Sequence, residues 1–298
     1  MRIPLAVTAA LLLLYSAFVA YGPRPSEARF QSGDELNRHV IERFSRHAER
    51  AEVVFVGSSM TARLGEAVAS PCAFNLALGG DSAATGLSVL TRTKAKPRLV
   101  FVEINVPERA SNPRLADEAT RVLPRLVPAL ATENMPANLL FSFLVQYKPT
   151  HSDPVVIDAV LATALAVQRN VYAREIDATM LSTNMQFMKS QVTLLESAGT
   201  RVVFFELPIH PSLENTPRAL QIRSAFASAF PGHRLLSSVE LARGIGIRTI
   251  DGVHLSPGEV SMVADRLRRA NDQVCPAKAP PQSAGGASND GVGGPAHA

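Results

Sequence analysis

The feature that most constrains the fold is a series of short, predominantly apolar segments, each followed by a turn and a helical pattern. They are VVFVG (53–57), CAFNLAL (72–78), RLVFVEI (98–104), RVVFFELP (201–208) and the shorter HRLLS (233–237). These segments have the length of strands and lack the strict alternation of a sheet with one solvated face. Apolar strands that alternate with helices are typical of a parallel sheet covered on both faces. We therefore predict an α/β fold, a three-layer α/β/α sandwich around a mainly parallel sheet of roughly five strands.

Other stretches divide the chain around this pattern. Residues 23–50 are predicted to form a linker and a leading helix, and residues 51–275 the α/β domain. Within that domain, residues 112–180 are helix-like and broken by prolines, which indicates a helical insertion. Residues 276–298 are rich in Pro, Gly, Ala and Ser without periodicity, as in disordered tails. In the insertion, the apolar run 139–144 is expected to be core, with a lid or partner surface over the site as the alternative.

The N-terminal segment is the first specific signal. MRIPLAVTAALLLLYSAFVAYG carries one arginine and then about 18 uncharged residues, long for a signal peptide and just enough for a membrane span. Arg24 and Arg29 follow it and do not favour a retained anchor. Residues 1–22 are therefore either a cleaved signal peptide or an anchor formed by residues 3–20, and a buried helix is the less favoured alternative. Both favoured interpretations place residues 30 onward in the periplasm or another extracytoplasmic space.

Charge and composition argue against several classes of function. The net charge is +4 without a run of basic residues, so nucleic-acid binding has little support, and Arg266, Arg268 and Arg269 indicate a solvated helix face. The chain has no GxxxxGK[ST] or dinucleotide fingerprint, which argues against a flavodoxin-like nucleotide binder. It has no CxxC or Cys/His cluster, so we expect neither a metal nor a cofactor. Cys72 and Cys275 could form one disulfide in an exported chain, or remain two free thiols.

Glycine and polar residues follow the ends of the predicted strands. They are Gly57-Ser58-Ser59, Gly79-Gly80-Asp81, Asn105 and His210. Ligands of open parallel sheets bind beyond the carboxyl ends of the strands. At a strand-to-helix turn the Ser59 hydroxyl can project from the sheet edge, or Ser58 or Ser59 can merely cap the helix. The backbone N–H groups of Ser59 and Gly80, with an amide N–H of Asn105, would give three donors for an oxyanion.

A second group of polar residues lies in DGVHLSPGE (251–259). Its SPGE part predicts a helix start, with Ser as N-cap, Pro at the first helical position and Glu closing a capping box. In the loop before it, Asp251 and His254 are three residues apart. The carboxylate can therefore hold Nδ1–H of the imidazole and leave Nε2 free to accept a proton. This is half of a nucleophilic triad, and a solvated Asp/His turn is the alternative.

The ordered set of residues resembles the SGNH, or GDSL-like, hydrolase family in four blocks. Gly-Asp-Ser after strand one corresponds to Gly57-Ser58-Ser59, and Asn-x-x-x-x-Gly corresponds to Asn75 through Gly80. The asparagine after strand three corresponds to Asn105, and the final Asp-x-x-His to Asp251 and His254. The resemblance covers about residues 50–110 and 200–272 and does not explain the helical insertion.

The resemblance implies a flavodoxin-like three-layer fold and a role for each matched residue. Ser59 would be the nucleophile, His254 the general base and Asp251 the residue that orients it. Gly80, Asn105 and the Ser59 N–H would form the oxyanion hole. The reaction would transfer an acyl group from an ester to water or to another hydroxyl, through an acyl-enzyme.

The chain departs from the family pattern at two points. Ser58 stands where the family has Asp, and the third block lacks the usual preceding Gly. The Gly-Ser-Ser form resembles exported, membrane-tethered members such as the D-alanine transfer protein of teichoic acid systems. We therefore expect an exported serine esterase or O-acyltransferase for acylated envelope carbohydrate or a small ester, with a membrane-bound acyl donor as a further expected partner. The alternative is a non-catalytic envelope glycan-binding or assembly protein on the same fold.

Two residues complete the expected site. Ser58 and His210 are expected to contact the substrate, because each lies where a predicted strand ends. A surface-loop histidine explains His210 equally well.

Overall fold

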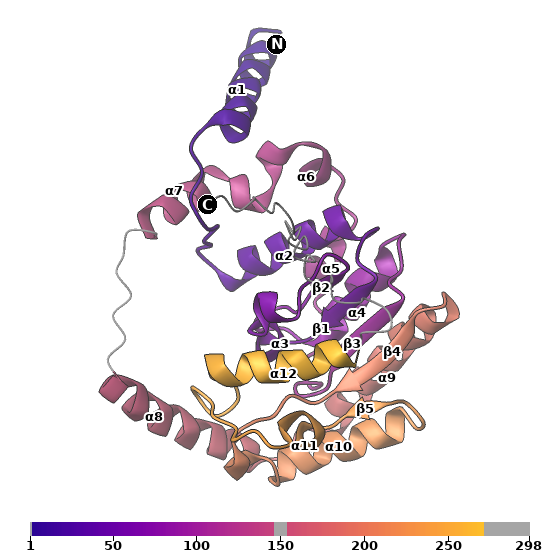
Figure 1. Cartoon of the computed structure of the whole chain (residues 1–298). Coiled ribbons are helices and arrows are strands. Elements are labelled where there is room, and N and C mark those ends of the chain that lie inside the picture. Colours follow the sequence, from indigo (N-terminus) through magenta and orange to yellow (C-terminus); the bar gives the residue numbers. More distant parts are fainter. Residues whose placement is uncertain (1, 146–153, 271–298) are drawn as a thin grey trace, which may run out of the picture.

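A parallel sheet forms the centre of the protein in the computed structural model, which describes residues 2–145 and 154–270 (Figure 1). Its five strands run in the order β2-β1-β3-β4-β5, and every pair is parallel. Their bounds are β1 (Val53–Val56), β2 (Ala73–Asn75), β3 (Leu99–Glu103), β4 (Arg201–Phe205) and β5 (Leu235–Leu236). The prediction of an α/β fold with a mainly parallel sheet is confirmed.

Helices cover both faces of the sheet. The longer helices are α1 (Arg2–Tyr21), α2 (Gly33–His47), α4 (Ala83–Arg92), α7 (Pro136–Val145), α8 (Pro154–Tyr172), α9 (Ala178–Ser197), α10 (Pro217–Ala229) and α12 (Pro257–Arg269). The short ones are α3 (Ser59–Ala62), α5 (Pro113–Glu118), α6 (Leu123–Leu126) and α11 (Ser238–Ala242), with 3-10 turns η1 (Gly65–Ala67), η2 (Pro128–Leu130), η3 (Thr132–Asn134) and η4 (Pro211–Leu213). Of these, α1, α6 and α7 lie beyond the layers that cover the sheet (Figure 1).

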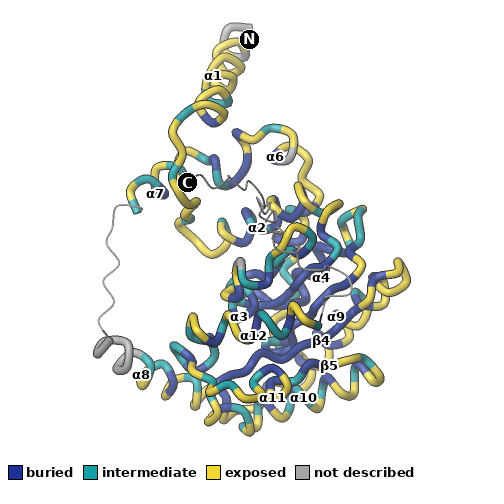
Figure 2. Tube along the Cα trace, viewed as in Figure 1, coloured by how far each residue is buried: buried dark blue, intermediate teal, exposed yellow. Residues whose placement is uncertain are grey.

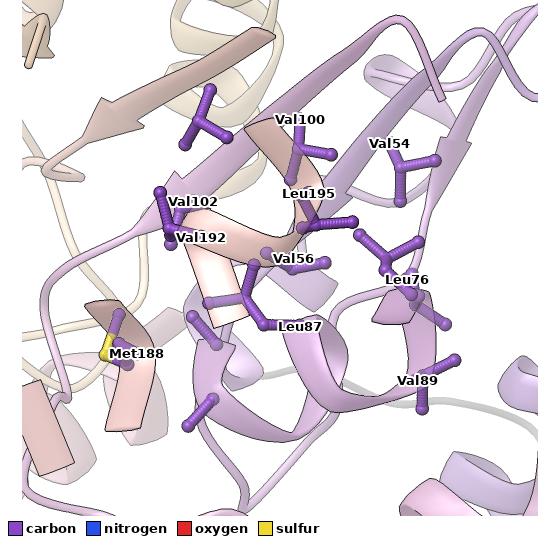
Figure 3. Packing of buried hydrophobic residues seen from close by; sticks show 14 of the residues in the cluster. Val54, Val56, Leu76, Leu87, Val89, Val100, Val102, Met188, Val192 and Leu195 are labelled. Carbon is purple, nitrogen blue, oxygen red and sulfur yellow. The ribbon is translucent and has the colours of Figure 1, made fainter. Parts of the chain in front are cut away.

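The central strands β1 and β3 are apolar, apart from Glu103 at the end of β3, because both of their faces are buried, as Figure 2 shows for the centre of the molecule. On one face, Val54, Val56, Val100 and Val102 pack with residues of α4 and α9 (Figure 3). On the other face, alternate residues such as Phe55 pack with α3, α11 and α12. This alternation follows from the two-residue period of a strand, which turns successive side chains to opposite sides.

The helical insertion differs from one expectation. The apolar run 139–144 of α7 is not core, because Leu140 is 61 % exposed and Leu144 is 63 % exposed. The prediction of core packing is therefore wrong. The physical reason is that α7 turns polar side chains inward: Asn138 and Ser142 are almost fully buried and hydrogen-bond the carbonyl groups of Thr132 and Arg29.

The N-terminal helix stands out from the body of the protein and is packed only at its foot (Figure 1). Val19 is 5 % exposed, and the Tyr15 hydroxyl donates a hydrogen bond to the Asn134 carbonyl. Among the described residues, no helix combines the length and apolar character needed to cross a membrane. The choice between a signal peptide and an anchor for residues 1–22 stays a prediction.

The sequence left open whether Cys72 and Cys275 form a disulfide or remain free thiols. Cys72, just before β2, is disulfide-bonded. Cys275, the other cysteine of the chain, and the predicted tail 276–298 lie outside the described residues.

Gly86 allows α4 to approach the sheet closely, and its substitution tests this packing. A Cβ there would lie 2.8 Å from Cβ and Cγ1 of Val56, whereas a Cβ at Gly258 in α12 would meet nothing within 4 Å. Gly86→Ala should lower the free energy of unfolding by about 1–3 kcal/mol through overpacking. Gly258→Ala should raise it by about 0.4–1 kcal/mol, because alanine loses less backbone entropy on folding. Urea unfolding of both variants measures the difference, and a stabilised Gly86→Ala protein would contradict the packing.

Candidate active site

Three side chains from opposite ends of the α/β domain meet beyond the carboxyl end of β1. His254 Nε2 lies 2.9 Å from Ser59 Oγ, and His254 Nδ1 lies 2.6 Å from Asp251 Oδ2. Ser59 and His254 are 195 residues apart in the sequence. The structure thus brings together all three residues expected to form a triad, at hydrogen-bonding distances for each link.

The turn between β1 and α3 decides which serine faces the histidine. Ser58 is the N-cap of α3, and its Oγ accepts a hydrogen bond from the Met60 N–H at 3.2 Å. Ser59, the first helical residue, therefore does not serve as the cap. The alternative left open by the sequence is resolved in favour of Ser58 as the cap.

Ser58 is also too buried to contact a substrate, contrary to expectation. It is 1 % exposed, and its hydroxyl donates to Glu103 Oε1 at 2.7 Å while accepting from Met60. Its polar atoms are used to hold the turn. The hydroxyl of this turn that faces His254 is that of Ser59.

A tight loop presents the Asp–His pair. Asp251 Oδ1 accepts hydrogen bonds from the N–H groups of His254 at 2.8 Å and Val253 at 3.1 Å. Gly252, which follows Asp251, adopts φ +100°, a conformation that favours glycine. The loop is closed by a 2.9 Å hydrogen bond from the Ile250 N–H to the His254 carbonyl. The carboxylate therefore holds the histidine by its backbone and its ring together.

The charge of Asp251 suits it to orient an imidazole. Partial burial acts to raise the pKa of this carboxyl, but the hydrogen bonds from His254 and Val253 outweigh it, and the pKa lies below its ordinary value. Asp251 is therefore ionised at neutral pH. An ionised carboxylate at Nδ1 favours the tautomer that leaves Nε2 free to accept a proton, and stabilises the imidazolium that then forms.

Glu103, at the end of β3, is a residue that the sequence analysis did not single out as part of the site. It is 3 % exposed, and its two oxygens accept four hydrogen bonds from the β1–α3 turn. The donors are Ser58 N–H at 2.8 Å, Ser58 Oγ at 2.7 Å, Thr61 N–H at 3.3 Å and Thr61 Oγ1 at 2.5 Å. One signal could have revealed it, since Glu103 is the only charged residue inside an otherwise apolar strand, 99–104.

Gly57 is required by the same contact. A Cβ at this position would lie 2.4 Å from Glu103 Oε2 and 2.5 Å from Thr61 Oγ1. Only glycine lets the carboxylate reach the turn. The glycine of the Gly-Ser-Ser motif thus leaves room for Glu103, and the N–H and hydroxyl groups of Ser58 donate hydrogen bonds to it. Ser59 then faces His254.

The other residues predicted for the oxyanion hole, Gly80 and Asn105, lie on the turns after β2 and β3. Gly80 has φ +76° and is exposed, and the preceding block residue Asn75 donates to the Thr61 carbonyl at 2.9 Å. The Asn105 side chain bridges to β4, because it accepts from Leu207 N–H at 2.8 Å and donates to Leu207 O at 2.9 Å. One hydrogen of its Nδ2 serves this bridge, so the second is the one available to an oxyanion. Their role in the oxyanion hole stays a prediction.

His210 supports the loop that carries Asp251 and His254 through its backbone. Its N–H donates to the Gly252 carbonyl at 2.8 Å, while its Nδ1 accepts from the Ser212 N–H at 3.2 Å and so caps η4. Helix α8 of the insertion packs against the same loop, since a Cβ on Gly252 would lie 3.1 Å from Leu165 Cδ1. The part of the insertion that touches the site is therefore α8 rather than the run 139–144. Substrate contact by His210 stays a prediction.

Comparison with known proteins adds no assignment. No protein-family model matches the chain, and no curated protein matches it. The resemblance to the SGNH hydrolases therefore stays a prediction that depends on its four blocks of residues.

Replacing Glu103 tests whether it holds the β1–α3 turn, which carries Ser59. Glu103→Leu leaves up to four donors buried without an acceptor, and each unsatisfied group costs about 1–3 kcal/mol. We expect this variant to lose about 3 kcal/mol or more of unfolding free energy, measured by urea denaturation. In Glu103→Gln, the amide oxygen can take the position of Oε2 and the NH₂ group can donate to Ser58 Oγ. That variant should lose about 1 kcal/mol or less, and equal stability of the Leu variant and the unmodified chain would contradict the assigned role.

The pH dependence of stability gives a separate test of Glu103. Burial raises the pKa of this carboxyl above its ordinary value of 4.5, although the hydrogen bonds from Thr61 and Ser58 act to lower it. Between those two pKa values the folded protein binds a proton that the unfolded chain has lost, so stability falls as pH rises. The stability of the unmodified chain relative to Glu103→Gln should therefore be greatest below pH 4.5 and should decline above it. Urea unfolding of both proteins across this range measures the decline, and a constant or rising difference would contradict the raised pKa.

Proposed function

We propose that the protein is an exported serine esterase or O-acyltransferase that acts on acyl esters of cell-envelope polysaccharide or similar compounds. One observation carries the proposal: Ser59 Oγ, the His254 ring and the Asp251 carboxylate form a continuous relay with links of 2.9 and 2.6 Å. Such a relay converts a weak hydroxyl into a nucleophile for carbonyl carbon.

The first half of the reaction forms an acyl-enzyme. His254 Nε2 takes the hydroxyl proton as Ser59 Oγ bonds to the ester carbonyl carbon. The carbonyl oxygen then carries a negative charge, which the N–H of Ser59, the N–H of Gly80 and the Asn105 amide would stabilise. When the intermediate collapses, the ester C–O bond breaks and the leaving alcohol receives the proton from His254.

The second half regenerates the serine. Water or a hydroxyl of an acceptor sugar gives its proton to His254 Nε2 and attacks the acyl carbon. Collapse of this second intermediate breaks the bond to Ser59 Oγ, which recovers the proton from His254. Hydrolysis and transfer thus differ only in the acceptor, and the same three residues serve both.

The cellular setting of the proposal comes from the sequence. The uncharged N-terminal segment supports export, and the Gly-Ser-Ser form resembles exported members that acylate surface polysaccharides. On this basis the substrate class is an acylated carbohydrate or a small ester, and a membrane-bound acyl donor is the expected partner of a transferase.

Labelling of Ser59 tests the proposal. The full chain should react with a fluorescent alkyl phosphonate and release p-nitrophenol from p-nitrophenyl acetate, while Ser59→Ala should show no labelling and at least about 10³-fold slower release. Ser228→Ala is the matched control, because Ser228 is an exposed serine on α10, and it should behave as the unmodified chain. Labelling that persists in Ser59→Ala, or is absent from the unmodified chain, would contradict the proposal and favour the non-catalytic binding protein.

A further inference from the structure

Helix α7 presents part of its apolar surface to the exterior, while its other apolar residues, Leu139, Phe141 and Phe143, are half-buried. Its buried residues are Asn138 and Ser142, which are bonded to neighbouring backbone groups, whereas Leu140 and Leu144 are 61 % and 63 % exposed. A helix on the surface of a soluble domain turns its apolar side toward the core. The outward apolar side of α7 therefore needs an apolar environment outside the chain.

The preceding segment has the same character. Val122, Leu123 and Leu126, in and beside α6, are 57 %, 64 % and 72 % exposed. We call residues 122–145 the collar, since α6 and α7 lie on either side of the foot of α1 in Figure 1. Monomeric soluble proteins rarely expose so many large apolar side chains together.

The collar continues onto the exposed leucines of α1. Leu11, Leu13 and Leu14 are 61 %, 70 % and 69 % exposed, and the next residue, Tyr15, is bonded to the collar through the Asn134 carbonyl. Leu11 is one helical turn, about 5–6 Å along the axis, from Tyr15. Any environment that takes up these leucines therefore reaches the collar as well.

The dimensions and charges of this surface favour a lipid bilayer as its partner. Amphipathic segments bind at the boundary of headgroups and acyl chains to a depth of about 5–10 Å. The distance along α1 from Leu11 to Tyr15, which is bonded to the collar, is of the same size. Arginines border the apolar residues: Arg121 precedes Val122, with a half-exposed side chain paired to Glu118, and Arg24 bonds to the carbonyl of Val19 at the foot of α1. Cations in this position complement anionic headgroups.

We propose that the collar and the adjoining leucines of α1 form one surface that docks the protein on an anionic lipid bilayer, with α6 and α7 in the interface. This surface is separate from the Ser59 site and requires no turnover, so it can be tested whether or not the protein is an esterase.

The absence of tryptophan from the chain permits a direct test. Single tryptophans are placed in the collar by Leu126→Trp and, separately, by Leu140→Trp. Leu13→Trp in α1 is the reference, and Val239→Trp is the matched control, because Val239 is 70 % exposed on α11, at the end of the molecule far from α1 (Figure 1). Each full-length variant is reconstituted in vesicles of phosphatidylcholine and phosphatidylglycerol, with or without bromine atoms near the start of the acyl chains.

Bromine quenches only tryptophans that reach the acyl-chain boundary. We expect about a twofold loss of fluorescence for both collar variants and for Leu13→Trp, and no loss for Val239→Trp. Collar tryptophans quenched no more than Val239→Trp would overturn the proposal. A blue-shifted collar emission without quenching would also overturn it, since it would show that a second copy of the chain covers the surface. Circular dichroism of each variant shows that the fold is retained, and two independent collar positions protect the test against a local defect.

Discussion

The turn that carries Ser59 depends on a single buried carboxylate. Glu103 extends from the end of β3 to the turn after its neighbour β1 and accepts four hydrogen bonds from Ser58 and Thr61. Burying a carboxylate is costly unless donors surround it, so the turn must offer its N–H and hydroxyl groups to Glu103. The same contact also requires glycine at position 57, because any Cβ there would clash with the Glu103 carboxylate. The position of Ser59 is thus a consequence of how Glu103 is accommodated.

Local sequence is sufficient to predict most of the sheet and the Asp251–His254 pair. Strand β1 is wholly apolar, and β3 is apolar up to its last residue, Glu103, because both faces of these strands are covered. This property can be read from four or five consecutive residues. The Asp251–His254 pair is equally local, since three-residue spacing around a glycine with positive φ brings the carboxylate to the ring. Ser59 follows β1, whereas Asp251 and His254 lie in the loop between α11 and α12, so the contact of Ser59 with His254 joins residues that are 195 apart in the sequence.

The features that escaped prediction depend on contacts between distant residues. Glu103 and Ser58 are 45 residues apart, and without that contact the sequence leaves open which serine caps α3. The run 139–144 was expected in the core because its composition is apolar. Its burial is decided instead by Asn138 and Ser142, whose hydrogen bonds to Thr132 and Arg29 turn the polar side of α7 inward. Composition gives the amount of apolar surface in a helix, but only its neighbours decide which side is covered.

The helical insertion therefore serves two regions of the molecule. Its last helix, α8, packs Leu165 against Gly252, where a Cβ would approach to 3.1 Å, and so fits the loop that carries Asp251 and His254. Its earlier part, the collar, packs against the foot of α1 at the other end of the structure (Figure 1). If the collar lies on a bilayer as proposed, Ser59 is held away from the lipid surface on the far side of α2. A nucleophile in that position is better placed for esters on a polysaccharide that extends from the membrane than for esters within the lipid itself.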